Sequence, residues 1–221
     1  MNNNVFLRIT RFEDAFAQIQ KFAQPIDEAE RISINGALNR VVARDVESPL
    51  DVPHFPRSSR DGYALIAADT FRAVEDKPIS LRLLGEVKAG EKPSAELSGG
   101  GCVKVSTGAM IPKGADSVAM VEYTVEDHRT VKLLRPSSPG ENIIKVGADI
   151  RTGDIVLKRG MKVSVFDLGV LSSVGLAEVE VYRKPKVAIM STGNELLSAA
   201  ERLEAGKVYD VNSVTIHQAV A

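Results

Sequence analysis

The residues best suited to chemistry are concentrated in one stretch of the chain, Asp51-Val52-Pro53-His54-Phe55-Pro56-Arg57-Ser58-Ser59-Arg60-Asp61-Gly62-Tyr63-Ala64. Two prolines, paired serines and an Asp-Gly step argue against a regular helix or a central strand, so we predict a shaped loop. Aromatic, basic and acidic side chains lie close together along it. Such a composition is more typical of a binding or catalytic site than of a connection.

Three aspartates are candidate site acids, namely Asp61 in this stretch, Asp149 and Asp210. Asp61 precedes a glycine, and Asp-Gly is a favoured turn pair, so a purely structural role is one interpretation. The other is that each carboxylate binds a divalent cation or positions a substrate oxygen. The residues alone leave both interpretations open.

A second candidate site follows the apolar run 187–190, which predicts a strand buried on both faces in a parallel sheet. Ligands collect at the carboxyl ends of such strands. Ser191 and Thr192 offer hydroxyls and amides to an anion, and Gly193 permits close backbone approach. Glu195 is placed to orient a substrate amine or hydroxyl. An ordinary strand-to-helix turn explains the same residues equally well.

A similar stretch ends the strand-like residues 101–105 and contains Thr107 between Ser106 and Gly108. Here we favour a β-turn over a ligand-binding loop.

Composition narrows the classes of function. The 221 residues carry 28 basic and 29 acidic side chains, a net charge of −1, and no basic run, so we expect no nucleic-acid partner. The three histidines lack the spacing of a zinc site or a catalytic triad. The single cysteine, Cys102, and the absence of a long apolar run predict a cytoplasmic protein without a disulfide or a membrane span. Residues 1–4 lack the basic start of a signal peptide.

The spacing of apolar residues predicts the elements that position these groups. A capping box at residues 10–13 begins a helix that ends near Ala23, and we expect its apolar face to be packed. A short helix at 36–40 and a strand at 41–46 lead into the loop. A small all-β domain, a barrel or a sandwich, is predicted from β-branched segments at residues 79–87, 102–107, 117–124 and 130–134.

The elements predicted further on are a linker at 136–140, a hairpin at 147–160, a helix at 163–174, a strand at 177–182 and a strand near 207–209. Asp210 is placed to cap a helix running into Ala221. One or two strands of a parallel sheet cannot bury both faces, so an α/β domain begins here without being completed. We therefore interpret the sequence as part of a longer protein.

A series of short motifs follows in a fixed order along essentially the whole chain: 51–64, 106–109, Pro112, 114–116, Glu122, 140–143, 147–150, Gly153, 184–187, 191–196 and 210–213. In that order they resemble the molybdenum-insertion enzymes of molybdenum-cofactor biosynthesis, the MoeA family, with the gephyrin E domain as an animal relative. Two positions depart from the family pattern. Arg60 stands where a methionine is usual, and Asn194 stands where Asp and Asn both occur.

The resemblance implies a mixed α/β multidomain protein, of which this chain holds the N-terminal portion. Its first, elongated α+β domain comprises residues 1–50 and 148–182. A small all-β domain, 51–147, is inserted between those two segments. Residues 183–221 begin an α/β molybdopterin-binding domain that is incomplete here, and a C-terminal β-barrel is absent.

The implied activity is transfer of molybdenum from molybdate into adenylylated molybdopterin, with release of AMP and with Mg²⁺ as cofactor. Carried over by position, the catalytic residues are Asp61, Glu195 and Asp210. Of these, Asp61 and Asp210 handle the metal. The substrate-binding residues are Thr107, Asp149, Ser191, Thr192 and Gly193.

The resemblance also implies a homodimer, in which the third domain of one subunit and the second domain of its partner form the cleft. The upstream molybdopterin adenylyltransferase is a further expected partner. Two alternatives to an active enzyme remain: a non-catalytic scaffold or binding module of the same architecture, and an inactive N-terminal fragment. We expect the 221 residues alone to be inactive.

Overall fold

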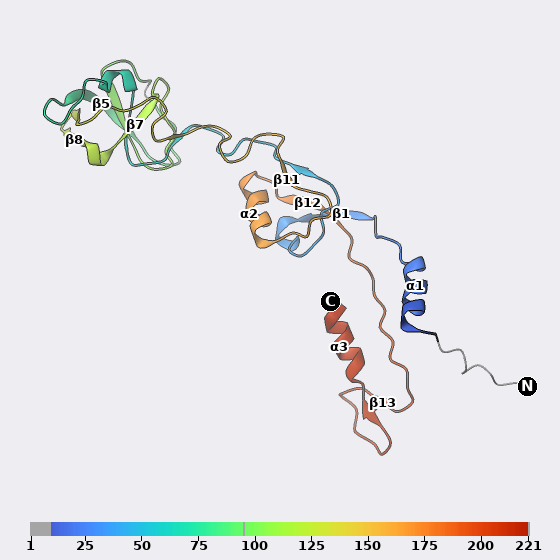
Figure 1. Ribbon diagram of the computed structural model, residues 1–221. Helices are drawn as coiled ribbons and strands as arrows, with labels where there is room; N and C mark the ends of the chain where they lie inside the picture. The colour runs from blue at the N-terminus through green and yellow to red at the C-terminus, as the bar shows by residue number, and fades with distance from the viewer. Residues whose placement is uncertain (1–9, 95, 221) are drawn as a thin grey trace, which may run out of the picture. The chain divides into compact units, whose positions relative to one another are not determined.

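The computed structural model describes residues 10–94 and 96–220, which divide into two compact units (Figure 1). The central unit is Arg31–Val181. The terminal unit consists of the described parts of Met1–Glu30 and Tyr182–Ala221. Within the described ranges, no helix is long and apolar enough to cross a membrane. The predictions made for residues 1–4 and for Ala221 lie outside these ranges.

A six-stranded sheet dominates the central unit. In spatial order its strands are β7 (Ser117–Met120), β4 (Gly62–Leu65), β6 (Gly101–Val105), β5 (Ile79–Val87), β9 (Thr130–Leu133) and β8 (Thr124–Asp127). All neighbours are antiparallel except β5 and β6, which are parallel. Strands therefore form in each of the β-branched segments predicted from the sequence, but the one predicted at 117–124 ends at Met120, where a 3₁₀ turn begins. We call residues 56–144 the β lobe.

The sheet is curled, because its two edge strands are consecutive in the chain. Only the 3₁₀ turn η3 (Val121–Tyr123) connects β7 to β8. Four Cα steps reach at most about 14 Å, whereas the edges of a flat six-stranded sheet lie roughly 24 Å apart. In agreement, the Tyr63 hydroxyl on β4 donates to Glu126 Oε2 on β8, at 2.5 Å. The predicted barrel or sandwich is thus a single sheet curled into a half-barrel.

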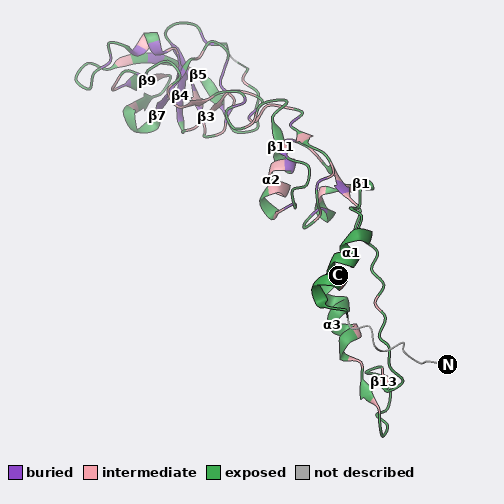
Figure 2. Ribbon diagram, turned by 45° about the vertical axis from the view of Figure 1, so that its right-hand side comes forward, coloured by how far each residue is buried: buried purple, intermediate pink, exposed green. Residues whose placement is uncertain are grey.

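Both faces of the sheet are buried (Figure 2). One core cluster contains Tyr63, Leu65, Ala73, Leu81, Cys102, Ala119, Val131 and Leu133. The other contains Ala64, Val87, Leu97, Val103, Val105, Ala109, Ile111 and Val118. Strand β4 alternates between the two clusters and is hydrogen-bonded on both sides. The prediction that the chemistry-rich stretch contains no central strand is therefore wrong for its end, where sheet pairing outweighs the turn preference of the Asp-Gly step. The 3₁₀ turn η2 (Ala67–Thr70) follows.

Two short antiparallel pairs join the chain entering the β lobe to the chain leaving it. Strand β3 (Arg57–Ser58) pairs with β10 (Ile143–Ile144), and β2 (Val46–Glu47) pairs with β11 (Ile155–Leu157). The hairpin predicted at 147–160 is therefore wrong. The partner of β11 lies before the inserted lobe, and glycine spacing in one segment carries no information about such a distant partner.

The rest of the central unit combines β1 (Ala29–Ser33) and β12 (Glu178–Tyr182), which form a two-stranded sheet, with α2 (Val165–Ser173). Helix α2 begins with a capping box between Ser164 and Asp167 and is followed by Gly175 in the left-handed region. This helix and strand β12 confirm the predictions at 163–174 and 177–182. Their core consists of Ala37, Val42, Leu157, Val163, Leu171, Val179 and Val181.

Two predictions before the β lobe need correction. The short helix expected at 36–40 is instead a 3₁₀ turn, η1 (Ile34–Gly36). It stops there because Asn39 adopts a positive φ of 65°. The strand expected at 41–46 is broken into isolated bridges at Val41 and Val42, followed by β2.

In the terminal unit the helix predicted from residue 10 is present as α1 (Phe12–Phe22). The predicted capping box is wrong, because the N-cap is Arg11 and no side chain caps the helix there. The Arg11 guanidinium instead pairs with Asp14 at 3.3 Å. No residue of α1 is buried, and Phe22 is 84% exposed. The expectation that this face is buried is therefore not met in this chain.

The terminal unit ends with β13 (Leu196–Leu197), β14 (Val208–Tyr209) and α3 (Val211–Val220). Strands β13 and β14 pair in parallel, as expected for the start of an α/β domain. The buried strand predicted at 187–190 is wrong, since these residues form no strand and Met190 is 83% exposed. A parallel pair of two-residue strands offers no sheet against which this run can be buried.

Candidate functional site

Asp61 and Thr107 meet at one end of the six-stranded sheet. Asp61 directly precedes β4, and Thr107 follows the end of β6. Because β4 and β6 are antiparallel neighbours with Gly62 opposite Val105, these two loops must lie side by side. The Thr107 N–H donates to Asp61 Oδ1 at 2.8 Å, and both side chains are exposed. A fixed backbone donor therefore holds one oxygen of an accessible carboxylate.

Gly62 has a role beyond the turn chemistry of an Asp-Gly step. A Cβ atom at this position would lie 2.0 Å from the Ala119 carbonyl oxygen on β7. Only glycine therefore permits β7 to approach β4 directly beside Asp61. The close approach ties the position of Asp61 to the buried sheet.

The loop that carries Thr107 is a β-turn, as favoured from the sequence. The Ala109 N–H donates to Ser106 O at 2.9 Å, and Gly108 has a φ of 83°. The Ser106 hydroxyl oxygen accepts from the Ala89 N–H at 3.1 Å. The turn is thus anchored on both sides, and the Thr107 side chain between the anchors is exposed.

Asp149 lies against the loop of the chemistry-rich stretch. Its N–H donates to Val52 O at 2.9 Å, and its carboxylate lies 3.7 Å from the Arg57 guanidinium. The pair is partly exposed, so it contributes little to stability. A cavity of about 670 Å³ is lined by Asp149, Arg151 and their neighbours between Ile143 and Asp154. Asp149 therefore borders a space large enough for a small polar ligand.

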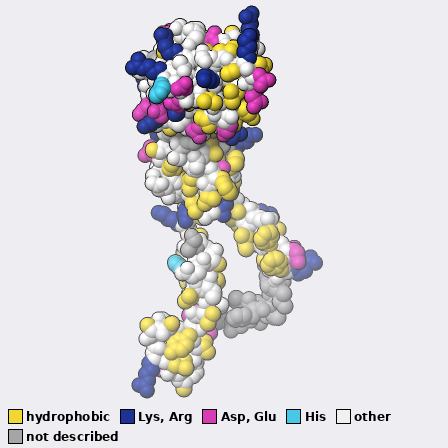
Figure 3. Space-filling view, turned by 90° about the vertical axis from the view of Figure 1, so that its left-hand side faces the viewer, with side chains coloured by type: hydrophobic (Ala, Val, Ile, Leu, Met, Phe, Trp, Pro, Cys, Tyr) yellow, Lys and Arg dark blue, Asp and Glu magenta, His cyan; other side chains and the backbone are white. Residues whose placement is uncertain are grey.

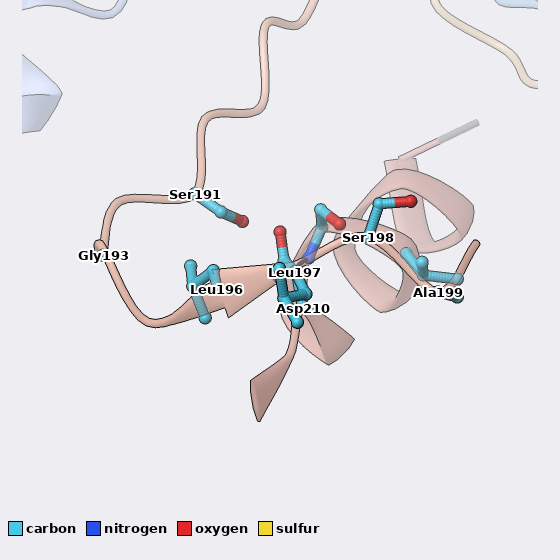
Figure 4. A pocket seen from close by; sticks show the side chains of 9 residues that line it. Ser191, Gly193, Leu196, Leu197, Ser198, Ala199 and Asp210 are labelled. Atoms are coloured by element: carbon cyan, nitrogen blue, oxygen red, sulfur yellow. Dashed lines mark hydrogen bonds between the residues drawn. The ribbon is translucent and has the colours of Figure 1, made fainter. Parts of the chain in front are cut away.

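In the terminal unit, Ser191, Gly193 and Asp210 line a pocket of about 440 Å³ at the ends of β13 and β14 (Figure 4). Figure 4 shows the Ser191 side chain directed toward Leu197 and Asp210. The remaining lining residues are Leu196, Leu197, Ser198, Ala199, Ser213 and Val214. The pocket thus joins three of the predicted site residues.

Asp210 connects the pocket to helix α3. Its Oδ1 accepts from the Ser213 N–H at 3.0 Å, which is the hydrogen bond of an N-cap. The Ser191 hydroxyl, and after it the backbone N–H of Ser213, lower the pKa of Asp210 below its ordinary value. The predicted cap is confirmed, and the carboxylate stays ionised at neutral pH.

Glu195 lies against Gly193 rather than in the pocket lining. A Cβ atom at Gly193 would be 2.6 Å from Glu195 Oε1, so the carboxylate covers this glycine. The backbone of Glu195 continues the β13–β14 pairing, since its carbonyl accepts from the Val208 N–H at 2.8 Å. Thr192 is exposed on the same loop.

The structure thus places the predicted site residues in two groups, one in each unit. The central unit holds Asp61, Thr107 and Asp149, and the terminal unit holds Ser191, Thr192, Gly193, Glu195 and Asp210. Over the visible face of the β lobe, acidic and basic side chains are interspersed (Figure 3). Local pairs such as Arg57 with Asp149, rather than a broad charged surface, therefore set the electrostatics there.

Sequence reasoning missed Ser198 and Ser213 as lining residues of the terminal pocket. Ser213 carried a usable signal, since it stands three residues after the predicted N-cap Asp210. Ser198 carried none, because its position depends on the pairing of β13 with β14. Within residues 10–94 and 96–220, no three His, Cys, Asp or Glu side chains are grouped closely enough to hold a metal ion.

Comparison with known proteins gives a consistent picture. Residues 10–175 match the family described as the MoeA N-terminal region (domain I and II). The molybdopterin molybdenumtransferase of Haemophilus influenzae is 36% identical over 190 residues, which are 86% of this chain and 46% of that protein. That of Staphylococcus aureus (strain Mu50) is 35% identical over 185 residues, which are 84% of this chain and 44% of that protein.

Solved structures agree at the level of the fold. A crystal structure of the molybdopterin biosynthesis MoeA protein from Pyrococcus horikoshii OT3 has a TM-score of 0.86 at 35% identity. It is matched over 96% of this chain and 57% of that one. A second structure of the Pyrococcus protein gives a TM-score of 0.84 at 37% identity, over 96% and 54%. The chain therefore spans about half the length of the relatives it matches.

Proposed function

Because the chain belongs to the family of MoeA N-terminal regions, we propose that it is the N-terminal portion of a molybdopterin molybdenumtransferase. The reaction is transfer of molybdenum from molybdate into adenylylated molybdopterin, with release of AMP. The observation that carries the proposal is the hydrogen bond between Asp61 and Thr107, which stand 46 residues apart in sequence. The resemblance assigns both residues to one site, and the fold makes them direct neighbours.

Asp61 is the principal catalytic acid of the central unit. Its Oδ1 is held by the Thr107 N–H, which leaves the second oxygen of an exposed carboxylate for a ligand. The Thr107 hydroxyl hydrogen-bonds an oxygen of the anionic substrate, as small hydroxyl residues in glycine-containing turns commonly do. Asp149 orients the substrate from the neighbouring cavity.

In the terminal unit, the pocket of about 440 Å³ receives part of the pterin substrate. Ser191 and Thr192 bind its anionic groups, and the backbone at Gly193 joins them once the Glu195 carboxylate that covers this glycine turns away. Glu195 orients a substrate amine or hydroxyl from beside Gly193. Asp210 already accepts hydrogen bonds from Ser191, Asn212 and Ser213, so it takes a substrate donor by exchanging one of these bonds.

The implied Mg²⁺ fits single carboxylates rather than a preformed cage. Mg²⁺ is commonly held by one or two carboxylates together with substrate phosphates and water, which suits the Asp61 oxygen that Thr107 leaves free. The Asp210 carboxylate already accepts from Ser191 and Ser213 and would exchange one of these hydrogen bonds for an ion. The described residues supply no group of three ligands, so the substrate must complete the coordination shell. The ion supplies charge neutralisation at the phosphate when it is bound.

The intact protein acts in the cytoplasm as a homodimer, with the molybdopterin adenylyltransferase as supplier of its substrate. The 221 residues alone are inactive, because they span about half of the relatives' length. A non-catalytic binding module is the second candidate. It is favoured by one observation, the exposed apolar face of α1 with Phe12 and Phe22.

The experiment that tests the proposal measures AMP release from adenylylated molybdopterin with molybdate and Mg²⁺. The proteins compared are this chain, a version extended through the remaining length of its relatives, and the extended Asp61→Asn variant. Release by the extended wild type alone supports the enzyme and the role of Asp61. Substrate binding by the extended wild type without AMP release contradicts the enzyme and leaves the binding module.

A further inference from the structure

Ser58 is a buried polar residue directly upstream of Asp61, with only 1% of its surface exposed. Its hydroxyl donates to the Arg60 carbonyl oxygen at 2.5 Å and accepts from the Arg60 N–H at 3.3 Å. One side chain thus fixes both backbone groups of Arg60, the residue that precedes Asp61. The direction in which the chain enters Asp61 depends on this turn.

The backbone of Ser58 holds the turn that carries Thr107. Its N–H donates to Ala109 O at 2.9 Å, and its carbonyl accepts from the Gly108 N–H at 2.8 Å. Ser58 therefore binds the chain neighbours of both partners of the Asp61–Thr107 hydrogen bond: its side chain holds Arg60, and its backbone holds Gly108 and Ala109.

Strand β3 also connects this pair to the segment that leads to Asp149. Ser58 stands opposite Ile143 on β10, and Arg57 stands opposite Ile144. Arg57 in turn approaches the Asp149 carboxylate at 3.7 Å. The two-residue strand β3 thus helps to position all three site residues of the central unit, Asp61, Thr107 and Asp149.

We propose that Ser58 is a positioning residue of the Asp61 site, and that its buried hydroxyl sets the orientation in which the Asp61 carboxylate meets the Thr107 N–H. Ser58 touches no substrate in this role. It acts through the 58–60 turn, and the consequence for turnover rests on the function proposed above.

A matched control is available in the same unit. Ser48 is 2% exposed, and its hydroxyl donates to the carbonyl of Leu50, also two residues onward, at 2.6 Å. Ser48→Ala and Ser58→Ala each remove one buried hydroxyl that donates to a carbonyl two residues onward, and Ser58→Ala also removes the bond from the Arg60 N–H. Both variants lose stability, whereas a positioning effect appears in Ser58→Ala alone.

The first test is independent of activity and measures hydrogen–deuterium exchange of the Thr107 amide by ¹H–¹⁵N NMR. In the wild type, the hydrogen bond to Asp61 Oδ1 protects this amide from exchange. In Ser58→Ala the protection is lost, as it is in Asp61→Ala, while Ser48→Ala retains it. Wild-type protection of the Thr107 amide in folded Ser58→Ala overturns the proposal.

The second test uses the extended protein and separates kcat from KM. Ser58→Ala lowers kcat by roughly tenfold to a hundredfold, the effect of misplacing a reacting group by about 1 Å. KM for the pterin substrate stays near the wild-type value, and Ser48→Ala leaves both constants unchanged. Equal kcat in Ser58→Ala and Ser48→Ala counts against the proposal. Full activity of Asp61→Asn instead removes the proposed role of Asp61, while the NMR result for Ser58 stands.

Discussion

In the β lobe, Asp61 and Thr107 stand at the ends of two strands that are buried on both faces. In the terminal unit, Asp210 directly follows β14 and Ser191 lies in the loop before β13, and both strands are only two residues long, with exposed or half-buried residues. The first pair is fixed by the packing of a sheet, and the second by local hydrogen bonds at a helix start. The two groups should therefore respond differently to changes in the core and to changes in pH.

The severest test of this contrast is Gly62→Ala. The new Cβ would lie 2.0 Å from Ala119 O, so β7 and β4 must separate, and we expect a loss of about 3 kcal/mol or more in unfolding free energy. Urea unfolding measures the change. Gly85→Ala, on β5 with no atom within 4 Å of the new Cβ, is the control and should be neutral or stabilising by up to about 1 kcal/mol. Equal unfolding midpoints for the two variants contradict the packing argument.

A smaller effect is expected from Thr70→Val, which removes a satisfied buried hydroxyl. Thr70 donates to Ala67 O and accepts from the Ser137 N–H, each at 2.8 Å. The buried Ser137 N–H loses its partner in the variant, at a cost of about 1–3 kcal/mol.

Ser117→Ala is the counterpart of this variant, with the opposite expected sign. The Ser117 hydroxyl is buried, and no described residue hydrogen-bonds it. Its removal should be neutral or should stabilise the β lobe by about 1 kcal/mol. Thermal unfolding of both variants measures the two changes in stability. Similar destabilisation of Thr70→Val and Ser117→Ala would show that the Ser117 hydroxyl has a hydrogen-bond partner in solution.

The curl of the sheet should weaken in acid. Lys104 first, and then Tyr63, lower the pKa of Glu126 below its ordinary value of 4.5 by hydrogen bonding. A lowered folded pKa means that the stabilisation is complete above 4.5 and is lost as pH falls through the folded value. The urea midpoint of the wild type should therefore fall in this range more steeply than that of Glu126→Gln. Parallel pH profiles contradict the role of this contact.

The smallest effect concerns the terminal unit and leaves the β lobe untouched. The Ser191 hydroxyl is the main cause of the lowered pKa of Asp210, so Ser191→Ala should raise that pKa toward its ordinary 3.8. The return is partial, because the Ser213 N–H still donates. Carboxyl ¹³C NMR measures the titration. Ser198→Ala, which also lines the pocket, is the control, and an equal shift there would remove the special role of Ser191.

Local sequence signals predicted the local structure well. Helix α2 was expected from its apolar run and from Gly175, and its bounds follow the Ser164 cap and that glycine. Strand β5 has the predicted bounds. Two local predictions were wrong, the capping box at residues 10–13 and the helix at 36–40. Other errors arose where a distant partner decides the outcome. Strand β11 pairs with β2 rather than within a hairpin, and the run at 187–190 lacks the sheet that would bury it.

The features of the candidate site likewise divide into those that nearby residues predict and those that depend on a distant partner. The turn at 106–109 and the cap at Asp210 were readable from nearby residues. The contact of Asp61 with Thr107 was not, because it requires knowing that β4 lies beside β6 in an antiparallel register. Only the family resemblance placed these two residues in one site. The contribution of Ser58 was hidden for the same reason, since its backbone partners lie in the turn after β6.

The pairing of the chain entering the β lobe with the chain leaving it has a consequence for the order of folding. The Thr152 N–H donates to Asp51 across 101 residues, and the Arg159 N–H donates to Asp45 across 114. Closing such loops in an unfolded chain is entropically costly and slow. Once the β lobe has formed, its two chain ends are already adjacent at β3 and β10, and the remaining loop to close is short. The β lobe should therefore fold first. The hydrogen bonds between the entering and leaving segments should form afterwards, beginning with those nearest to β3 and β10.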